Sequence, residues 1–217
     1  AASDVYKRQR GDLENAKLDL TSNDKTAPVA RNTSMMAFDA CACLRGQHKC
    51  DYDVPGAYLQ GEQKPEEARV YRPPYGFRKF DERGVEILWL SQHPFYGSPD
   101  AGAIWNRTMN ETLTSDADPH GCGFARCPQD PSVYSVNMTG GDDGQVNSTL
   151  YVDDGRLAWD DAAPAVQKST VVKKRLAKRY GIEFGEDDPP ETHFLGANIS
   201  SAASRKVTTI KATSYIE

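Results

Sequence analysis

The sequence predicts an α+β fold in which an antiparallel sheet is backed by helices. Two segments carry apolar side chains at helical spacing, and a third combines a capping residue with good helix formers. The runs between them are short, apolar and bounded by turn residues, as strands are. Helices and strands alternate irregularly instead of in βα pairs, which favours α+β over a parallel α/β sheet. Apolar residues make up 38% of the 217 residues, enough for a buried core.

The three predicted helices cover residues 33–45, 101–113 and 162–180. The first starts at Thr33, a residue type that caps helices, and continues with good helix formers. The second aligns four large apolar side chains on one face, which we expect in the core: Ile104, Trp105, Met109 and Leu113. The third spaces apolar residues by four and is otherwise rich in Lys and Arg. We interpret its basic side as a solvated helix face; a phosphate-binding surface is the alternative.

Strands are predicted where short apolar or β-branched runs lie between turn residues. They are 49–54, 85–91, 132–138, 147–152, 155–159, 193–200 and 206–212, and a further strand within 68–77 that runs into a Pro-Gly turn. The run 85–91 is apolar enough to be a buried strand. The Gly- and Asp-rich stretch 139–144 is expected to be a turn, and 181–191 an acidic loop.

Composition restricts the class of protein. The formal net charge of -5 argues against a highly basic nucleic-acid binder, although it is compatible with a local basic groove. No apolar run approaches the length of a membrane span, so no membrane partner is expected. The 5 cysteines are an odd number and no secretory signal precedes them, which predicts an intracellular protein with reduced thiols. We interpret residues 1–10 as an artefact or a disordered tail, and the chain as a fragment.

Two adjacent acids interrupt the stretch Leu150–Asp161, which reads LYVDDGRLAWDD. Asp153 and Asp154 follow an apolar strand, so they lie where the core ends. A hairpin turn is one interpretation, because Asp is common in turns. A cation site is the other, because adjacent carboxylates repel one another unless a cation offsets their charge. The second pair, Asp160 and Asp161, is expected to cap the helix that follows.

A third carboxylate, Asp53, ends another predicted strand. Phosphoryl transfer by two metal ions requires such a set, with one ion activating a hydroxyl and the other holding the leaving phosphate oxygens. Carboxylates from adjacent strand ends can bridge two ions that lie about 3.5–4 Å apart. Oxygen ligands suit Mg²⁺, which keeps bound waters and shares substrate phosphates. We therefore expect two Mg²⁺ ions as cofactors.

Six motifs, in order along the chain, resemble those of the reverse transcriptase domain of copia-type LTR retrotransposons. They are APVARNTS from Ala27, YDVPGAYLQGE from Tyr52, VYRPPYGF from Val70, FYGSPDAGAIW from Phe95, LYVDDGRLAW from Leu150 and HFLGANIS from His193. One such motif is weak evidence, but six in this order are specific. The resemblance covers the chain from Ala27 to Ser200.

The resemblance implies catalytic and metal-binding roles for the residues at matching positions. Asp53 and Asp153 would hold both Mg²⁺ ions with the assistance of Asp154, and Val54 would offer its backbone carbonyl to a metal ion. Tyr58 would be a gate whose ring excludes a ribose 2′-OH, so that deoxynucleotides are preferred. A packed core aromatic is the alternative role for Tyr58.

Further substrate-binding residues follow from the same resemblance. Arg31 would contact the nucleotide triphosphate, unless it is an ordinary exposed arginine. Tyr96 and Gly97 would line the pocket for the template and the nucleotide. In many relatives Lys and Gln follow the Tyr-Gly pair, whereas this chain has Ser98 to Asp100 there and so lacks the usual basic and amide side chains.

The resemblance implies an RNA-directed DNA polymerase, a nucleotidyltransferase that adds dNTPs to a primer 3′-OH on an RNA or DNA template. The implied architecture is fingers–palm. Fingers-like elements would comprise 11–48 with 59–115, and the palm 49–58 with 116–217, without thumb, connection or RNase H domain. The remaining partner would be the rest of a Gag-Pol-like polyprotein. The expected location is the cytoplasm, in a virus-like particle, or the nucleus.

Two other interpretations stay open. The first is a degenerate retrotransposon remnant that folds and retains at most nucleic-acid binding. The net negative charge favours it, and so does the run Glu183–Glu191, which contains no Lys to protonate the leaving pyrophosphate. The second is an unrelated α+β domain whose acidic hairpin binds a metal ion or nothing. Only the polymerase interpretation requires Asp53 and Asp153 to lie close together.

Overall fold

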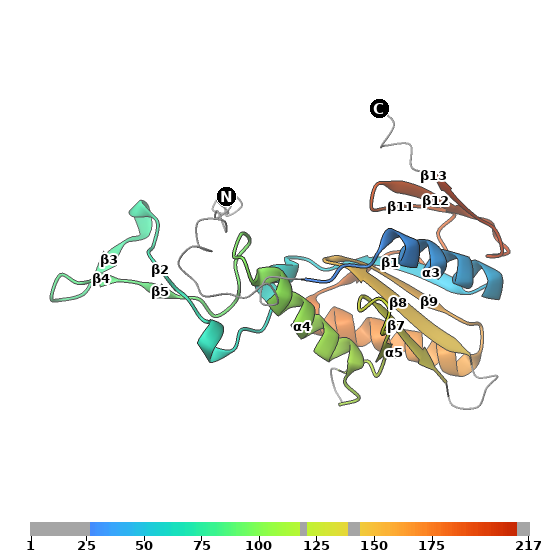
Figure 1. Ribbon diagram of the computed structural model, residues 1–217, viewed down its shortest axis with the longest axis horizontal. Helices are drawn as coiled ribbons and strands as arrows, with labels where there is room; N and C mark the ends of the chain where they lie inside the picture. The colour runs from blue at the N-terminus through green and yellow to red at the C-terminus, as the bar shows by residue number, and fades with distance from the viewer. Residues whose placement is uncertain (1–26, 118–120, 139–143, 212–217) are drawn as a thin grey trace. The chain divides into compact units, whose positions relative to one another are not determined.

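The computed structural model describes residues 27–117, 121–138 and 144–211 (Figure 1). The predicted tail 1–10 and most of the predicted turn 139–144 lie outside the described residues. The chain divides into two compact units, a smaller one containing Ala57–Thr108 and a larger one containing Pro28–Gly56 and the residues from Met109 onward. The assignment of fingers and palm to these parts stays a prediction.

The larger unit is built on a six-stranded sheet with strand order β10-β1-β9-β8-β7-β6, and all its strand pairs are antiparallel. The strands are β1 (His48–Asp53), β6 (Ala125–Arg126), β7 (Val133–Asn137), β8 (Gln145–Tyr151), β9 (Asp154–Trp159) and β10 (Glu183–Phe184). The predicted α+β class with an antiparallel sheet is confirmed.

Strand β1 is an interior strand of this sheet, between β10 and β9, although both neighbours are distant in sequence. It pairs with β9 over its full length, from His48 opposite Trp159 to Asp53 opposite Asp154. Strands β8 and β9 form a hairpin whose last pair is Tyr151 with Asp154. The end of β1 therefore lies beside the β8–β9 turn.

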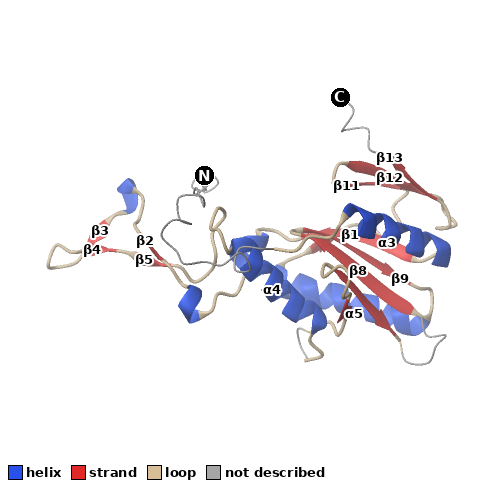
Figure 2. Ribbon diagram, viewed as in Figure 1, coloured by secondary structure: helices blue, strands red, loops and turns tan. Residues whose placement is uncertain are grey.

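Helices cover both faces of the sheet (Figure 2). Helix α3 (Asn32–Arg45) packs Phe38 against Ala158 of β9. Helix α5 (Ala163–Tyr180) contacts β8, β9 and β10, and its Lys173 ammonium lies 4.2 Å from the ring centroid of Trp159. Adjacent strand residues point to opposite faces, so Ala158 and Trp159 place α3 and α5 on opposite faces.

The buried faces of the helices follow the predicted periodicity. Helix α5 buries five side chains: Ala165, Ser169, Val172, Leu176 and Tyr180. Its basic residues also serve the fold, since Lys173 pairs with Asp187 and the Arg175 guanidinium donates to the carbonyl of Gly121. Helix α4 (Ala101–Thr114) buries the four predicted core residues at 2% exposure or less, so Trp105 is a core residue as predicted. No helix among the described residues is both long and apolar enough to cross a membrane.

A separate three-stranded antiparallel sheet in the larger unit contains β11 (Glu191–Phe194), β12 (Ala197–Ser201) and β13 (Thr208–Lys211). The prediction of one strand over 193–200 is wrong, because Leu195 and Gly196 adopt φ of 47° and 79° and turn the chain into a hairpin. The Lys49 ammonium of β1 donates to hydroxyls on β12 and β13, Ser201 at 3.1 Å and Thr208 at 3.0 Å. Burial lowers the pKa of Lys49, while the nearby Asp39 carboxylate acts to raise it.

The smaller unit carries two two-stranded ribbons, β2 (Val70–Tyr71) with β5 (Trp89–Leu90) and β3 (Lys79–Phe80) with β4 (Glu86–Ile87). Among the described residues, this unit also contains three short 3₁₀ helices, η1 (Ala57–Gln60), η2 (Pro65–Glu67) and η3 (Tyr75–Phe77), and the first part of α4. The predicted buried strand 85–91 is wrong, since Val85 is 60% and Leu90 64% exposed. These strands belong to isolated two-stranded ribbons, which are too small to cover their own apolar side chains.

Two predictions about acidic residues also require correction. The predicted loop 181–191 contains β10, which pairs Glu183 with Asp53 at the end of β1. Asp160 and Asp161 do not cap α5, because the N-cap position is Ala162 and it has no side-chain cap. Asp160 instead accepts hydrogen bonds from Arg45 and from the backbone N–H of Gln145. These acids hold neighbouring elements together.

Gly155 has no room for a side chain. A Cβ atom at this position would lie 2.1 Å from Cζ of Tyr52, the residue opposite it on β1. The Tyr52 ring is 4% exposed, and its hydroxyl lies 3.2 Å from Oγ of Ser148. The glycine after the acidic pair therefore lies within β9 and accommodates the Tyr52 ring.

We predict that Gly155→Ala lowers the free energy of unfolding by about 1–3 kcal/mol, because the added methyl group must displace a buried ring. Urea denaturation measures the change. Gly185→Ala is a matched control in the same unit, since a Cβ there would meet only the Asp51 carbonyl oxygen, at an ordinary 3.4 Å. A control change within about 0.5 kcal/mol is expected. Equal effects of the two substitutions would contradict the packing role of Gly155.

Candidate active site

The β8–β9 turn presents the acidic pair. Strand β8 ends at Tyr151 and β9 begins at Asp154, so Val152 and Asp153 are the two residues of the turn. Val152 has φ of 59°, a left-handed conformation that a β-branched residue adopts only under constraint. Two-residue hairpin turns favour glycine where φ is positive. The turn is therefore locally strained next to Asp153.

The end of β1 brings Asp53 to this turn. Asp53 is the last residue of β1 and lies opposite Asp154 in the strand register. The next residue, Val54, is 1% exposed and donates its backbone N–H to the carbonyl of Asp153 at 3.0 Å. Asp53, Asp153 and Asp154, which we call the acidic edge, thus come together as the polymerase interpretation requires.

The acidic edge is open to solvent. Asp53 is exposed, while Asp153 and Asp154 are half-buried. The pKa of Asp154 is raised, first by burial and then by the negative charges of Asp153, Asp53 and Asp51. The carboxylates are therefore close enough to repel one another. A cation at this edge would offset that repulsion.

The donor atoms of the acidic edge fit an oxygen-preferring divalent cation. Carboxylate oxygens are the ligands that Mg²⁺ takes from proteins, usually one or two of them together with waters and substrate phosphates. Within the described ranges, however, no group of three or more His, Cys, Asp or Glu side chains is placed so that it could hold a metal ion. The metal-binding roles of the three acids and of the Val54 carbonyl therefore stay predictions.

The smaller unit contains three of the predicted substrate-binding residues. Tyr58 lies in η1 and is half-buried, with its ring centroid 5.0 Å from that of Tyr96 and the ring planes at 43°. Gly97 follows with φ of 95°, a value that favours glycine. The structure thus brings Tyr58 and Tyr96 together. The ring contact fits the core-aromatic alternative, whereas the partial exposure leaves a face for a ligand.

Arg31 is exposed and occupies the N-cap position of α3. Its backbone N–H donates to Oδ2 of Asp130 at 3.0 Å, which fixes the start of the helix. This contact involves the main chain, so it supports neither the triphosphate role of the side chain nor the alternative of an ordinary surface arginine. The role of Arg31 stays a prediction.

Sequence reasoning missed the buried ion network beside the acidic edge. Arg156 of β9 is 2% exposed and bonds to Asp39 at 2.6 Å and to Asp51 at 2.7 Å. Two signals for it were in the sequence. Arg156 is a charged residue in the middle of an apolar strand, and Asp51 precedes Asp53 by the two-residue period of a strand face.

Comparison with known proteins identifies the family. The family model described as reverse transcriptase (RNA-dependent DNA polymerase) matches residues 10–217. The transposon Ty5-1 protein of Saccharomyces cerevisiae is 30% identical over 157 residues, which cover 72% of this chain and 44% of that protein. The chain thus spans less than half the length of this relative.

Among solved structures, telomerase from Candida albicans in complex with a fragment of telomeric RNA matches with a TM-score of 0.39 and 10% identity. The match covers 93% of this chain and 37% of that chain. Such a TM-score is too low to support an argument. The family match over nearly the whole chain and the transposon relative are sufficient by themselves: the chain belongs to the reverse transcriptase (RNA-dependent DNA polymerase) family and, as its motifs predict, to the copia-type retrotransposon members.

Proposed function

We propose that this chain carries the polymerase centre of an RNA-directed DNA polymerase. It would extend a primer 3′-OH on an RNA or DNA template, with attack on the α-phosphate of a dNTP and release of pyrophosphate. One observation carries the proposal: Asp53 and Asp154, from strands far apart in sequence, are directly paired beside Asp153. Together with the family membership, this supports a nucleotidyltransferase site.

Reverse transcriptases generally use divalent metal ions, and we propose two Mg²⁺ ions for this site. Asp53 and Asp153 would hold both ions, with Asp154 and the Val54 carbonyl as further ligands. The ions would lower the pKa of the primer hydroxyl and neutralise the charge of the leaving phosphates. The chain itself contributes positioning, through the β1–β9 register, and charge, through the acidic edge.

We further propose that Tyr58 is the gate against ribonucleotides, and that Tyr96, Gly97 and Arg31 contact the nucleotide or the template. The smaller unit would supply fingers-like elements, and the larger unit the palm. The partners would be a template–primer, a dNTP and the rest of a Gag-Pol-like polyprotein. The protein would act in the cytoplasm, in a virus-like particle, or in the nucleus.

A degenerate remnant that binds nucleic acid without catalysis is the second candidate. Two observations favour it. Within the described ranges the acids do not enclose a metal ion, and the run Glu183–Glu191 lacks a Lys that could protonate the pyrophosphate. The primer-extension experiment below separates this candidate from the polymerase.

We predict that Asp153→Asn reduces primer extension by about 100-fold or more, because it removes a carboxylate that would hold the two metal ions, and these ions would neutralise the charge on the reacting phosphates. The assay measures incorporation of dNTPs on a primed RNA template with Mg²⁺. Asp116→Asn, which replaces an exposed acid outside the acidic edge, is the matched control and is expected to retain activity. Equal activity of wild type and Asp153→Asn would exclude Asp153 as a metal ligand. If wild type and Asp153→Asn are both inactive but still bind the template, the result favours the degenerate remnant that binds nucleic acid without catalysis.

We predict that Tyr58→Ala increases the incorporation of ribonucleotides relative to deoxynucleotides by about tenfold or more, because no ring remains to oppose the 2′-OH. Tyr58→Phe keeps the ring and its packing on Tyr96, and is expected to keep the discrimination. The ratio of kcat/KM for matched rNTPs and dNTPs is the measurement. If Tyr58→Ala lowers both values equally, Tyr58 is a packing residue and the gate role is rejected.

We predict that Asp154→Asn stabilises the metal-free protein at pH 7 by about 0.5 kcal/mol, a small value because the group is partly exposed. The folded chain raises the pKa of Asp154 above its ordinary 3.8. Because the folded chain binds this proton more tightly than the unfolded chain does, protonation of Asp154 stabilises the fold. This stabilisation is fully present below pH 3.8 and is lost as the pH rises through the raised pKa of the folded chain. The advantage of Asp154→Asn in urea denaturation should therefore grow as pH rises from 4 to 7.

Mg²⁺ should reverse this difference, because an ion that binds the folded chain at the acidic edge stabilises wild type more than the variant. A stability gain from Mg²⁺ that is identical in wild type and Asp154→Asn would show that the ion binds elsewhere.

A further inference from the structure

A second charged pair lies on the same face of the sheet as the acidic edge. Asp51 is opposite Arg156 in the β1–β9 register, and two residues along each strand Asp53 is opposite Asp154. Side chains two residues apart on a strand share a face, with their Cα atoms about 6.5 Å apart. Asp51 is therefore a fourth carboxylate, one row of the ladder behind the acidic edge.

Arg156 holds Asp51 in place. The Arg156 side chain is 3% exposed, and its Nε donates to Asp51 Oδ1 at 2.7 Å. Its Nη1 donates to Asp39 Oδ2 on α3 at 2.6 Å, and its guanidinium carbon lies 5.1 Å from the ring centroid of Phe194. A buried guanidinium fixed by two carboxylates and an aromatic ring has one available position.

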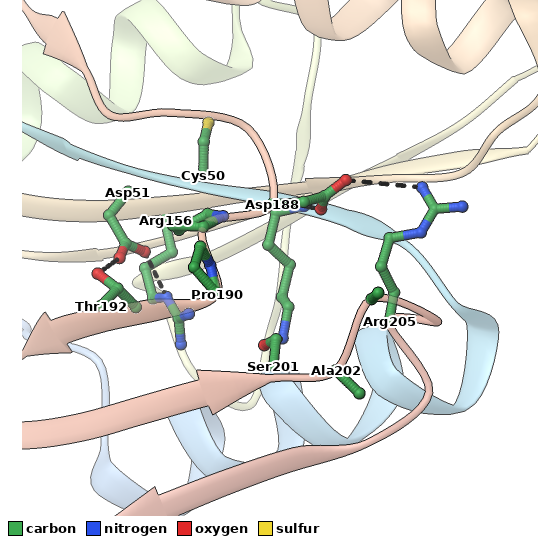
Figure 3. Close-up of a pocket in the computed structure, with 12 residues that line it drawn as sticks. Cys50, Asp51, Arg156, Asp188, Pro190, Thr192, Ser201, Ala202 and Arg205 are labelled. Carbon is green, nitrogen blue, oxygen red and sulfur yellow. Dashed lines mark hydrogen bonds and ion pairs between the residues drawn. The ribbon is translucent and has the colours of Figure 1, made fainter.

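The other oxygen of Asp51 is also engaged. Oδ2 of Asp51 accepts a hydrogen bond from the hydroxyl of Thr192 on β11. Figure 3 shows Arg156 and Thr192 on either side of the Asp51 carboxylate, in a cavity of about 170 Å³. Both oxygens of Asp51 are thus bound by side chains from other strands, and the carboxylate is retained in this cavity instead of joining the acidic edge.

We propose that Arg156 is a positioning residue that withholds Asp51 from the divalent-cation site at the acidic edge. The proposal rests on the proposed function, because it takes the acidic edge to be where the ion binds. Arg156 neutralises Asp51 and fixes its direction, so the site keeps three carboxylates. Without Arg156, the fourth carboxylate adds its full negative charge one row from Asp53 and Asp154, and the ion is held too tightly to exchange freely.

The test is a Mn²⁺ titration of the 217-residue chain, with free Mn²⁺ measured by electron paramagnetic resonance. Arg156→Met removes the cation beside Asp51, and about tenfold tighter Mn²⁺ binding is expected. Asp51→Asn removes a negative charge that offsets the positive charge of Arg156. Arg156 then repels the nearby cation more strongly, and about threefold weaker Mn²⁺ binding is expected. The double variant removes both charges and should return to within about twofold of wild type.

The two single substitutions are expected to change the Mn²⁺ affinity in opposite directions, which distinguishes a positioning role from a merely structural one. Both single substitutions break the buried network and destabilise the chain, so a structural role predicts weaker Mn²⁺ binding in both. Shifts in the same direction, or a double variant that binds as Arg156→Met does, overturn the proposal. Arg156→Lys keeps the charge and should bind Mn²⁺ as wild type does. If Arg156→Met does not fold, the Asp51→Asn variant tests the proposal alone. Unchanged or tighter Mn²⁺ binding by Asp51→Asn then overturns the positioning role of Arg156.

Asp153→Asn separates the failure of this inference from the failure of the proposed function. If Asp153→Asn binds Mn²⁺ as wild type does, the ion is not at the acidic edge, and both proposals fail. If Asp153→Asn weakens binding while Arg156→Met and Asp51→Asn leave it unchanged, the acidic edge stands and only the positioning role of Arg156 is overturned.

Discussion

The pairing of β1 with β9 is the interaction on which the rest of the larger unit depends. It joins two segments that are far apart in the sequence, and it fixes which side chains share a face. A slip of one residue would move Asp53 to the face occupied by Tyr52 and bury a carboxylate. The Tyr52 ring over Gly155 opposes such a slip, because no other residue of β9 lacks a side chain. Packing on one face of the sheet thus determines which carboxylates share the other face.

Charge is arranged along the same pair of strands. The row nearest the β8–β9 turn contains only acids, whereas the next row contains Asp51 with Arg156. Burial of an unpaired carboxylate is costly. Asp51, in the row farther from the turn, therefore requires a cation beside it, and the acids of the acidic edge require solvent. The exposure of Asp53 and the buried position of Arg156 meet these two requirements. The change from paired to unpaired acids marks the boundary between core and candidate site.

The sequence predicted features that depend on local patterns and on motifs. The helix periodicity identified Trp105 as core. The acids at strand ends predicted that Asp53 lies near Asp153, and the β1–β9 register and the Val54–Asp153 backbone hydrogen bond place them near one another, while their catalytic role stays a prediction. It failed where long-range packing decides. The apolar run around Trp89 looks like a buried strand, yet it forms an exposed ribbon. Gly155 was correctly predicted to lie in a strand, but its contact with the Tyr52 ring was not predicted, because that ring belongs to a strand whose register no local pattern determines.

Two unfavourable features lie at the acidic edge. Val152 adopts a positive φ in the turn, and the pKa of Asp154 is raised by burial and by neighbouring charges. Each of these costs free energy in the metal-free chain. The paired register of β1 and β9 and the buried Arg156 network hold the acids together in spite of that cost. The register and the network thus keep three carboxylates at one edge of the sheet in the metal-free chain, and the binding of a divalent cation there stays a proposal.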